Sequence, residues 1–422
     1  MTNPSTLTAT EAARHIRDGR LSAEEVMEAY IERIDAAEAD VRAFAWFSSD
    51  QARHAARVAR DGPLKGLPVG VKDVLDTEDM PSEYGSPIWD GWQPRADAAA
   101  VAWARQAGAV VIGKTVTTEF ATRKPGPTAN PANLAHTPGG SSSGSAAGVA
   151  AGFFPLAFGT QTAGSIIRPA AFCGVVGYKP SYGTISRIGM KIMSDSLDTV
   201  GVMARTVADC ALFAGAVSGR DLGNPDEAPD RVPRIGICRS PTWHAAANET
   251  HALLDQVIAA VAKAGAIVSG VELPETYNRL IEAHPIVMNA ESARALGWEL
   301  ANHAGMISDD LRARMEFGLE QAPIDLDNAY AVFEATQRGF PDAMGEIDVL
   351  LTPSAPGEAP EGLGWTGDPC FNFIWTSLRV PCVTVPAGTG PKGLPLGIQI
   401  VGRRGEDRTA LALARWVQAA LG

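Results

Sequence analysis

One serine stands out for the small residues that precede it. Ser165 lies in GTQTAGSIIRPAAFCG, residues 159–174. Small side chains leave the backbone N–H groups of Thr162, Ala163, Gly164 and Ser165 free to converge on one point, and converging N–H donors stabilise a developing oxyanion. A serine nucleophile beside such donors is the chemistry that this stretch would support. The alternative is a glycine turn that contains a serine by chance.

A second stretch, HTPGGSSSGSAAGVAAG at residues 136–152, combines glycines with hydroxyl side chains. Gly139, Gly140 and Gly144 permit backbone conformations that other residues avoid, and Ser141 opens a run of serines. A flexible linker is disfavoured because an Ala/Val helix pattern follows at once. A phosphate-binding loop is disfavoured because the stretch contains neither GxxxxGK[ST] nor GxGxxG.

The third candidate is Lys72, in LPVGVKDV. Apolar residues and glycine precede it, so we expect Lys72 at or near the end of a buried strand. Burial disfavours the charged ammonium, and a neutral lysine is a base. On the local sequence alone the favoured interpretation is different: a lysine that reaches water and pairs with Asp73 or Asp76.

The elements that must position these residues follow an alternating pattern. Residues 1–60 are expected to form a helical layer, with Ser/Thr-x-x-Glu capping boxes beginning at Thr8 and Ser22. Later, short Val/Ile/Gly runs alternate with Ala-rich helical stretches, which predicts an α/β fold with helices on both faces of the sheet. The strands expected in the second half cover residues 234–239, 266–273, 348–354, 382–388 and 396–402.

Two turn-rich segments interrupt this pattern. Residues 218–233 are either a linker at a subdomain edge or, as favoured, a surface loop. Residues 352–369 are rich in Pro and Gly, and a loop of this length inside a compact domain is often functional. Aromatic residues in or beside that loop either line a pocket or belong to the core: Trp365, Phe371, Phe373 and Trp375.

Composition narrows the classes of function. The 36 basic and 48 acidic residues give a net charge of −12, and without a dense basic run this argues against nucleic-acid binding. No apolar run predicts a membrane span, and the N-terminus lacks the apolar core of a signal peptide. The five cysteines are scattered without CxxC spacing, which argues against a metal site or a disulfide framework. We therefore expect a cytoplasmic protein with reduced thiols.

Taken together, the three stretches resemble the amidase signature family. In that family a Gly/Ser block precedes the nucleophile segment at a fixed distance; here Ser141 and Ser165 are 24 positions apart, and Lys72 lies 69 positions before Ser141. Further similarity runs through AVVIGKTVTTEFA, GYKPSYGTIS, SLDTVGVMARTVADC and FNFIWTSLRVPCVTVPAG, and so covers most of the chain. Within the family, the motifs look most like the malonamidase branch.

The resemblance implies a mechanism and a fold. Ser165 matches the nucleophile, Ser141 the bridging serine, which follows a cis peptide, and Lys72 the terminal base. The amides of residues 162–165 match the oxyanion hole. The implied fold is a single domain over residues 1–422 with a mixed, twisted sheet of about eleven strands. Neither a cofactor nor a metal is expected, and the substrate is a small amide.

Two positions depart from the family pattern, and one arginine lies outside its common spacing. The usual Gly-Gly-Ser reads Ala163-Gly164-Ser165, and Gln161 stands where many relatives carry aspartate. Arg168 follows the nucleophile by three positions, as in the malonamidase branch, where the arginine is implicated in holding a substrate carboxylate. A structural arginine paired with internal carbonyls or a carboxylate is the equal alternative. Trp375 is the second candidate for contact with substrate.

Other functions use the same residues. Carbamates, and urea-like compounds such as biuret, pass through one acyl-serine mechanism. The glutamine-hydrolysing chain of a tRNA amidotransferase, which works with partner proteins, is a less favoured alternative because KTVTTEF lacks the Asn-Met-Asp usual there. A catalytically inactive binding homologue is disfavoured by the intact lysine and serines. A homodimer is an open expectation.

Overall fold

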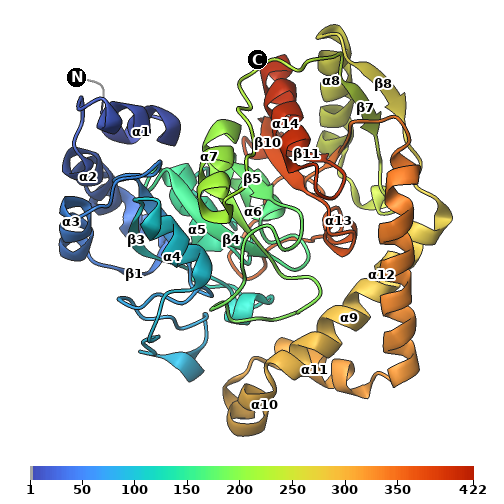
Figure 1. The fold of residues 1–422 in the computed structure, drawn as a ribbon. Helices are drawn as coiled ribbons and strands as arrows, with labels where there is room; N and C mark the ends of the chain where they lie inside the picture. Colours follow the sequence, from blue (N-terminus) through green and yellow to red (C-terminus); the bar gives the residue numbers. More distant parts are fainter. Residues whose placement is uncertain (1–2) are drawn as a thin grey trace.

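The computed structural model describes residues 3–422, in which fourteen α-helices surround one sheet of eleven strands (Figure 1). The strands are β1 (Phe44–Phe47), β2 (Pro68–Lys72), β3 (Val110–Thr115), β4 (Leu156–Gln161), β5 (Val176–Lys179), β6 (Thr199–Ala204), β7 (Arg234–Ile237), β8 (Ile267–Gly270), β9 (Val349–Pro353), β10 (Cys382–Thr389) and β11 (Pro395–Val401). Their order across the sheet is β1-β3-β2-β4-β6-β5-β10-β11-β9-β7-β8. The expected mixed α/β sheet is confirmed.

Strand direction within the sheet matters for the site. β2 pairs in parallel with both β3 and β4, β7 pairs in parallel with β8 and β9, and the remaining neighbours are antiparallel. Because β2 and β4 run parallel, with Gly70 paired to Ala157, both strands end at the same edge of the sheet. Their last residues are Lys72 and Gln161.

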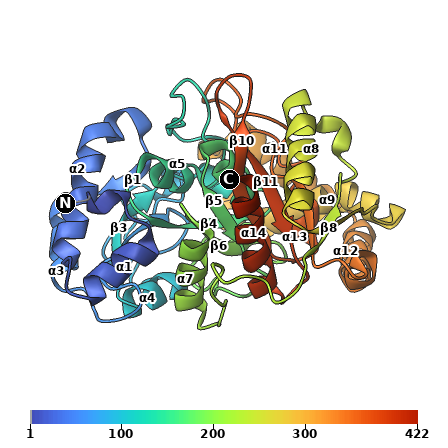
Figure 2. The same ribbon diagram turned by 90° about the horizontal axis from the view of Figure 1, so that it is seen from above.

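Helices cover both faces of the sheet (Figure 2). α7 packs against β5 and β6, α14 packs against β10 and β11, and these two helices contact each other. α5 lies on the opposite face of the sheet from α7 and contacts α6. The helices are α1 (Ala9–Arg17), α2 (Ala23–Val41), α3 (Ser49–Arg57), α4 (Ala99–Gln106), α5 (Ser143–Ala151), α6 (Ile167–Cys173), α7 (Val207–Ser218), α8 (Asn248–Lys263), α9 (Leu280–Ala295), α10 (Gly297–His303), α11 (Asp309–Glu320), α12 (Pro323–Met344), α13 (Phe373–Ser377) and α14 (Asp407–Leu421).

The N-terminal layer is helical with one exception. Both capping boxes form, at the starts of α1 and α2. The residues FAWF, however, form the short edge strand β1, which pairs antiparallel with β3. Aromatic side chains favour strands, and here two phenylalanines of the run pack beside the apolar face that the sheet offers. The expectation of an all-helical layer over residues 1–60 is corrected at this point.

Helices α9 to α12 form an extension between β8 and β9, at the lower right of Figure 1. α9 packs against α11, α12 and α13, and the contacts enclose a second buried cluster that includes Leu280, Val287 and Phe340. By contrast, residues 218–233 only join α7 to β7, and the strands before and after them belong to the same sheet.

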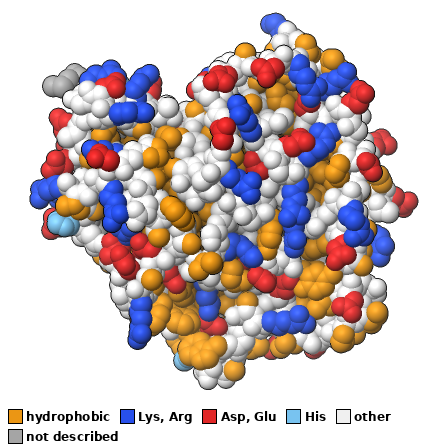
Figure 3. Space-filling model, viewed as in Figure 1, with side chains coloured by type: hydrophobic (Ala, Val, Ile, Leu, Met, Phe, Trp, Pro, Cys, Tyr) orange, Lys and Arg blue, Asp and Glu red, His pale blue; other side chains and the backbone are white. Residues whose placement is uncertain are grey.

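The surface is mixed in charge. On the face seen in Figure 1, acidic and basic side chains are interspersed over most of the elements (Figure 3). Among residues 3–422, no helix combines the length and the apolarity that crossing a membrane requires. All five cysteines are buried and free of disulfides.

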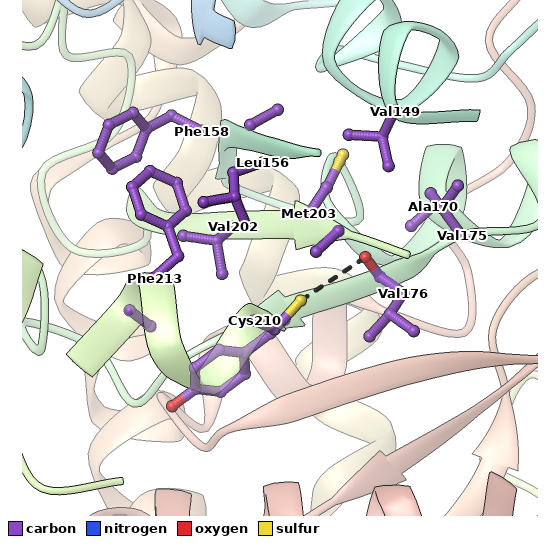
Figure 4. Close-up of a cluster of buried hydrophobic side chains, with 14 of the residues drawn as sticks. Val149, Leu156, Phe158, Ala170, Val175, Val176, Val202, Met203, Cys210 and Phe213 are labelled. Carbon is purple, nitrogen blue, oxygen red and sulfur yellow. Dashed lines mark hydrogen bonds between the residues drawn. The ribbon is translucent and has the colours of Figure 1, made fainter. Parts of the chain in front are cut away.

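The main core lies between the two helical layers (Figure 4). Leu156 and Phe158 of β4 and Val202 of β6 lie between Val149 of α5 and Phe213 of α7. The rings of Phe158 and Phe213 pack with their centroids 4.6 Å apart. The Phe158–Phe213 contact fixes β4 relative to α7, and separate contacts between α5 and β4 hold together the two segments that carry the candidate serines.

Candidate active site

Lys72 ends its strand inside the protein. Its side chain is fully buried, and Nζ lies 2.7 Å from Ser141 Oγ and 2.7 Å from Thr160 Oγ1. Burial lowers the pKa of Lys72 to about 7, and the negative charge of Asp198 only partly opposes that shift. Near neutral pH a large share of Lys72 is therefore an uncharged amine that can accept a proton from Ser141.

The neighbouring carboxylates are already paired. Asp73 Oδ1 lies 2.8 Å from Lys114 Nζ, and both side chains are buried. Asp76 accepts a hydrogen bond from the Tyr84 hydroxyl at 2.7 Å. Lys72 thus neither reaches water nor pairs with Asp73 or Asp76, contrary to the interpretation that its local sequence favours.

The Gly/Ser block runs into the start of α5. The Gly140–Ser141 peptide is cis. Ser143 Oγ donates to the Gly139 carbonyl at 2.8 Å, and Ser145 Oγ donates to the Phe158 carbonyl at 2.8 Å. These serines fasten the block to its surroundings, while Ser141 is the member whose hydroxyl contacts Lys72.

Ser165 lies on the turn between β4 and α6, where three backbone carbonyls accept hydrogen bonds, two of them from distant segments. The Thr162 carbonyl accepts from His284 Nε2 at 3.0 Å, and the Ala163 carbonyl accepts from Thr376 Oγ1 at 2.8 Å. The Gly164 carbonyl accepts from the backbone N–H of Arg168 at 2.9 Å.

Anchored carbonyls determine where the next N–H groups point. In a trans peptide the C=O and the following N–H point in opposite directions. The N–H groups of Ala163, Gly164 and Ser165 therefore point away from the three anchors, and within residues 3–422 none of them donates a backbone hydrogen bond. They are free to bind a ligand atom.

The structure shows what Gln161 and Ala163, the two departures from the family pattern, contact. Gln161 Oε1 accepts from the backbone N–H groups of Ile166 and Ile167, at 2.9 and 3.1 Å, and so holds the turn at the start of α6. Ala163 is half-buried, and its residue lines the pocket in front of Ser165. Ala163 thus forms part of the pocket wall, and the turn forms with alanine at this position.

Ser165 opens on a cavity of about 300 Å³. Its walls come from the turn at 162–165, from α9, from α11 and from residues 365–369. Trp365 and Phe373 line it. Trp375 does not: its ring is fully buried in the second cluster beside Phe340, 6.2 Å between centroids. The proposed aromatic contact with substrate therefore moves from Trp375 to Trp365 and Phe373.

Arg168 fits both of its sequence interpretations in part. The side chain is 4% exposed, with Nε donating to the Thr366 carbonyl at 2.8 Å and Nη2 donating to the Gly140 carbonyl at 2.7 Å. Nη1 has no hydrogen-bond partner among residues 3–422, and Arg168 lines the cavity. Burial lowers its pKa to about 10, so the guanidinium stays charged at neutral pH. One nitrogen is left for a ligand while two hold the backbone.

His284 is a site residue that sequence reasoning missed. It lies on α9, lines the cavity, and is buried. Burial lowers its pKa to about 4, so the ring is neutral at pH 7, and its contact with a carbonyl places the proton on Nε2. A single histidine without a local motif gives no sequence signal, because its partner, the carbonyl of Thr162, is distant in the chain.

Among residues 3–422, no group of three or more His, Cys, Asp or Glu side chains is arranged to hold a metal ion. The chain offers a serine on a cavity, free N–H groups on the same turn, and a buried lysine that contacts the hydroxyl of Ser141. With the mixed α/β sheet, these features define an enzyme of the serine hydrolase class.

The chain belongs to the amidase family, because a family model described as Amidase matches residues 25–411. The A subunit of the glutamyl-tRNA(Gln) amidotransferase of Halothermothrix orenii is 32% identical over 467 residues, which covers 98% of this chain and 97% of that protein. A crystal structure of an amidase superposes with a TM-score of 0.90 at 30% identity, covering 99% of this chain and 100% of that one. The native peptide amidase of Stenotrophomonas maltophilia follows at 28% identity, a TM-score of 0.81, and coverage of 98% and 96%. The resemblance to the malonamidase branch stays a prediction.

Proposed function

We propose that the protein is a serine amidohydrolase that cleaves the C–N bond of small amides through an acyl-serine formed on Ser165. The observation that carries this proposal is the fully buried Lys72, 2.7 Å from Ser141 and with its pKa lowered to about 7 by burial. Burial also lowers the pKa of Lys179, but the Nζ of Lys179 donates to backbone carbonyls, whereas Lys72 contacts a hydroxyl that can pass it a proton.

In the proposed first step, Ser165 Oγ attacks the amide carbonyl carbon. Its proton passes to Ser141 Oγ as Ser141 passes its own proton to Lys72 Nζ. The carbonyl oxygen becomes an oxyanion, held by the N–H groups of the turn at 162–165. When the tetrahedral intermediate collapses, the C–N bond breaks and the leaving nitrogen takes the proton back through Ser141. The products of this step are the amine and an acyl ester on Ser165.

The second step repeats the relay with water. Water loses a proton through Ser141 to Lys72 as its oxygen adds to the ester carbonyl. Collapse then expels Ser165 Oγ, which regains a proton along the same path. The carboxylic acid leaves, and the enzyme returns to its starting protonation state.

An acidic amide is the substrate that the inner cavity supports best. Arg168 is charged and buried, and its unpartnered Nη1 belongs to a residue of the cavity lining. A buried guanidinium nitrogen without a partner carries a desolvation cost that a carboxylate would offset. Malonamate, with a carboxylate one carbon from its amide carbonyl, is the simplest such substrate.

The test combines a covalent probe with a substrate panel. A fluorophosphonate should label the wild type at Ser165, as read by peptide mass spectrometry, and leave Ser165→Ala unlabelled. Ammonia or amine release is then measured with malonamate, malonamide, acetanilide, an aryl carbamate and biuret. We expect malonamate to have a higher kcat/KM than the neutral malonamide.

Each other outcome has a defined meaning. Turnover of the carbamate or of biuret alone would assign the same mechanism to a carbamate or urea-like substrate. Undiminished turnover by Ser165→Ala, in a preparation cleared of wild type, would refute the nucleophile. Arg168→Leu is a poor test of carboxylate binding, since it also removes the bond to the Gly140 carbonyl.

The second candidate is the glutaminase step of an amidotransferase. The similarity to the A subunits of glutamyl-tRNA(Gln) amidotransferases, over 98% of the chain, favours it. Glutamine carries both a carboxylate and an ammonium, and the cavity lining includes Asp368 as well as Arg168. Glutamine hydrolysis that rises on adding partner proteins purified with the chain would support this candidate, and malonamate hydrolysis by the isolated chain would support the first.

A further inference from the structure

The cavity in front of Ser165 is basic although the chain is acidic. Within residues 3–422 its lining contains three guanidinium groups, those of Arg123, Arg168 and Arg314, against one carboxylate, that of Asp368. The whole chain carries a net charge of −12. The net negative charge of the chain disfavours the approach of anions, so the arginines make this cavity a local region that attracts them.

The three arginines differ in their exposure and in the groups that they contact. Arg168 is buried, and two of its nitrogens hold backbone carbonyls. Arg123, by contrast, lies in the exposed segment after β3, and no carboxylate within residues 3–422 pairs with it. A guanidinium that serves neither the fold nor an ion pair is available to a ligand.

Arg314 lies on α11, with its side chain 17% exposed. Its Nε and Nη2 contact Asp310 at 3.1 and 2.9 Å, which leaves Nη1 outside that ion pair. After burial, the positive charge of Arg123 is a further cause of the lowered pKa of both Arg168 and Arg314. Arg123 is thus close enough to both residues for their like charges to be felt.

We infer that Arg123 and Arg314 form an outer anion subsite in this cavity. The cavity then takes amides that carry two acidic groups: one binds Arg168, and the other, a carboxylate, binds the pair Arg123 and Arg314. The inference rests on the proposed function for the cleavage itself. Its physical basis is that the planar guanidinium fork matches a carboxylate, and that crowded like charges are relieved when an anion binds between them.

Binding to the Ser165→Ala protein tests the subsite without turnover. Calorimetry compares succinate, glutarate, adipate and pimelate, each against its monomethyl ester. The subsite predicts that at least one diacid binds about threefold to tenfold more tightly than its ester, and that salt weakens this preference. Arg123→Gln should remove most of the preference. Arg338→Gln, which changes the same charge on an exposed arginine of α12, should keep it.

Turnover gives a second readout. N-malonylglycine has a carboxylate on each side of its amide, whereas N-methylmalonamate has one. In the wild type the first should have the lower KM, and Arg123→Gln should raise that KM with little effect on the second substrate. Two results would overturn the outer subsite. One is that no diacid binds Ser165→Ala more tightly than its monoester and the wild type has no lower KM for N-malonylglycine; the other is that Arg123→Gln leaves such a preference intact. Failure of the proposed function would differ: no labelling of Ser165 and no hydrolysis, whatever the diacids do.

Discussion

Lys72 makes its two side-chain hydrogen bonds to hydroxyls, those of Ser141 and Thr160. The adjacent Asp73 is paired with Lys114, and the carboxylate whose charge acts on Lys72 is that of Asp198. At the scale of single residues, the effect of burial on the pKa of Lys72 outweighs the effect of that negative charge.

The pH dependence of the rate follows from Lys72. Its pKa is lowered to about 7 by burial, so the ammonium form accumulates as pH falls through 7 and cannot accept the proton of Ser141. We expect kcat/KM on a neutral amide to fall on the acidic side of an apparent pKa near 7 and to reach a plateau above it. A neutral substrate keeps Arg168 out of the measurement.

Lys72→Ala provides the control for that profile. Removing the base should cost about 10²–10⁴-fold in kcat/KM and abolish the acidic limb, while circular dichroism shows an unchanged fold. A variant that retained the same acidic limb would show that another group titrates.

His284 offers a prediction about positioning. It anchors the Thr162 carbonyl and so aims the Ala163 N–H. His284→Phe keeps an aromatic ring beside Phe373 but loses the donor. We expect kcat to fall about tenfold to a hundredfold with KM changed little, because a misdirected donor weakens the transition state more than the ground state.

Two measurements separate this role from a purely structural one. A trifluoromethyl ketone, which forms an oxyanion on the serine, should lose affinity in His284→Phe in parallel with kcat. His284→Gln, whose amide nitrogen can donate to the same carbonyl, should recover part of both. Equal losses of kcat and of thermal stability in the two variants would argue for a structural role.

At the scale of elements, Gly144 allows α5 to lie close to the backbone beside β1 and β3. A Cβ on Gly144 would lie 2.1 Å from the carbonyl oxygen of Ala43 and 2.5 Å from the backbone N of Val116. Gly144→Ala must therefore push α5 and Ser141 away from the sheet. We expect a loss of about 1–3 kcal/mol in the free energy of unfolding, measured with denaturant, and a larger proportional loss of activity.

Gly297 is the matched control for that substitution. It begins α10, and no heavy atom lies within 4 Å of the Cβ that alanine would add. Gly297→Ala should leave activity unchanged and be neutral or stabilising by about 0.5–1 kcal/mol. A similar destabilisation by both substitutions would mean that the close packing of α5 is not the cause.

Elements were predictable where local pattern and environment agree. The strands of the second half come close to their expected ranges, such as β9 at Val349–Pro353 against 348–354, because buried strands need continuous apolar runs. β1 is not predicted, because four residues between two helices are too few for a period that separates strand from helix. The sequence patterns also do not predict the extension α9–α12, although it supplies one wall of the cavity.

At the scale of the whole molecule, residues 218–233 provide a test of domain organisation. The strands on both sides of the segment lie in one sheet, and residues from both sides share the main core. A chain nicked by trypsin within this segment should therefore give two bands on a denaturing gel but one peak in native size-exclusion chromatography. Separation of the two fragments without denaturant would show two independent domains and contradict a single domain over 1–422.

The sequence predicts some residues of the site and not others, depending on whether their place is set locally or by distant packing. The motifs of Lys72, Ser141 and Ser165 sit in sequence-local contexts that a family resemblance can match. The places of Trp375 and His284 could not be predicted, because both depend on how helices α9 and α13 pack against the turn at 162–165. Long-range packing of this kind leaves no spacing in the sequence.

The hydrogen bonds that hold the turn at 162–165 have a consequence for the evolution of proteins that carry these motifs. Its carbonyls are held by His284 of α9 and Thr376 of α13, on segments encoded far from the Lys-Ser-Ser motifs. Recombination or drift that replaced those segments would leave every motif intact and still misdirect the oxyanion donors. Lineages that have lost catalysis in this way would carry a perfect signature, so the inheritance of activity should track positions 284 and 376 as well as the motifs.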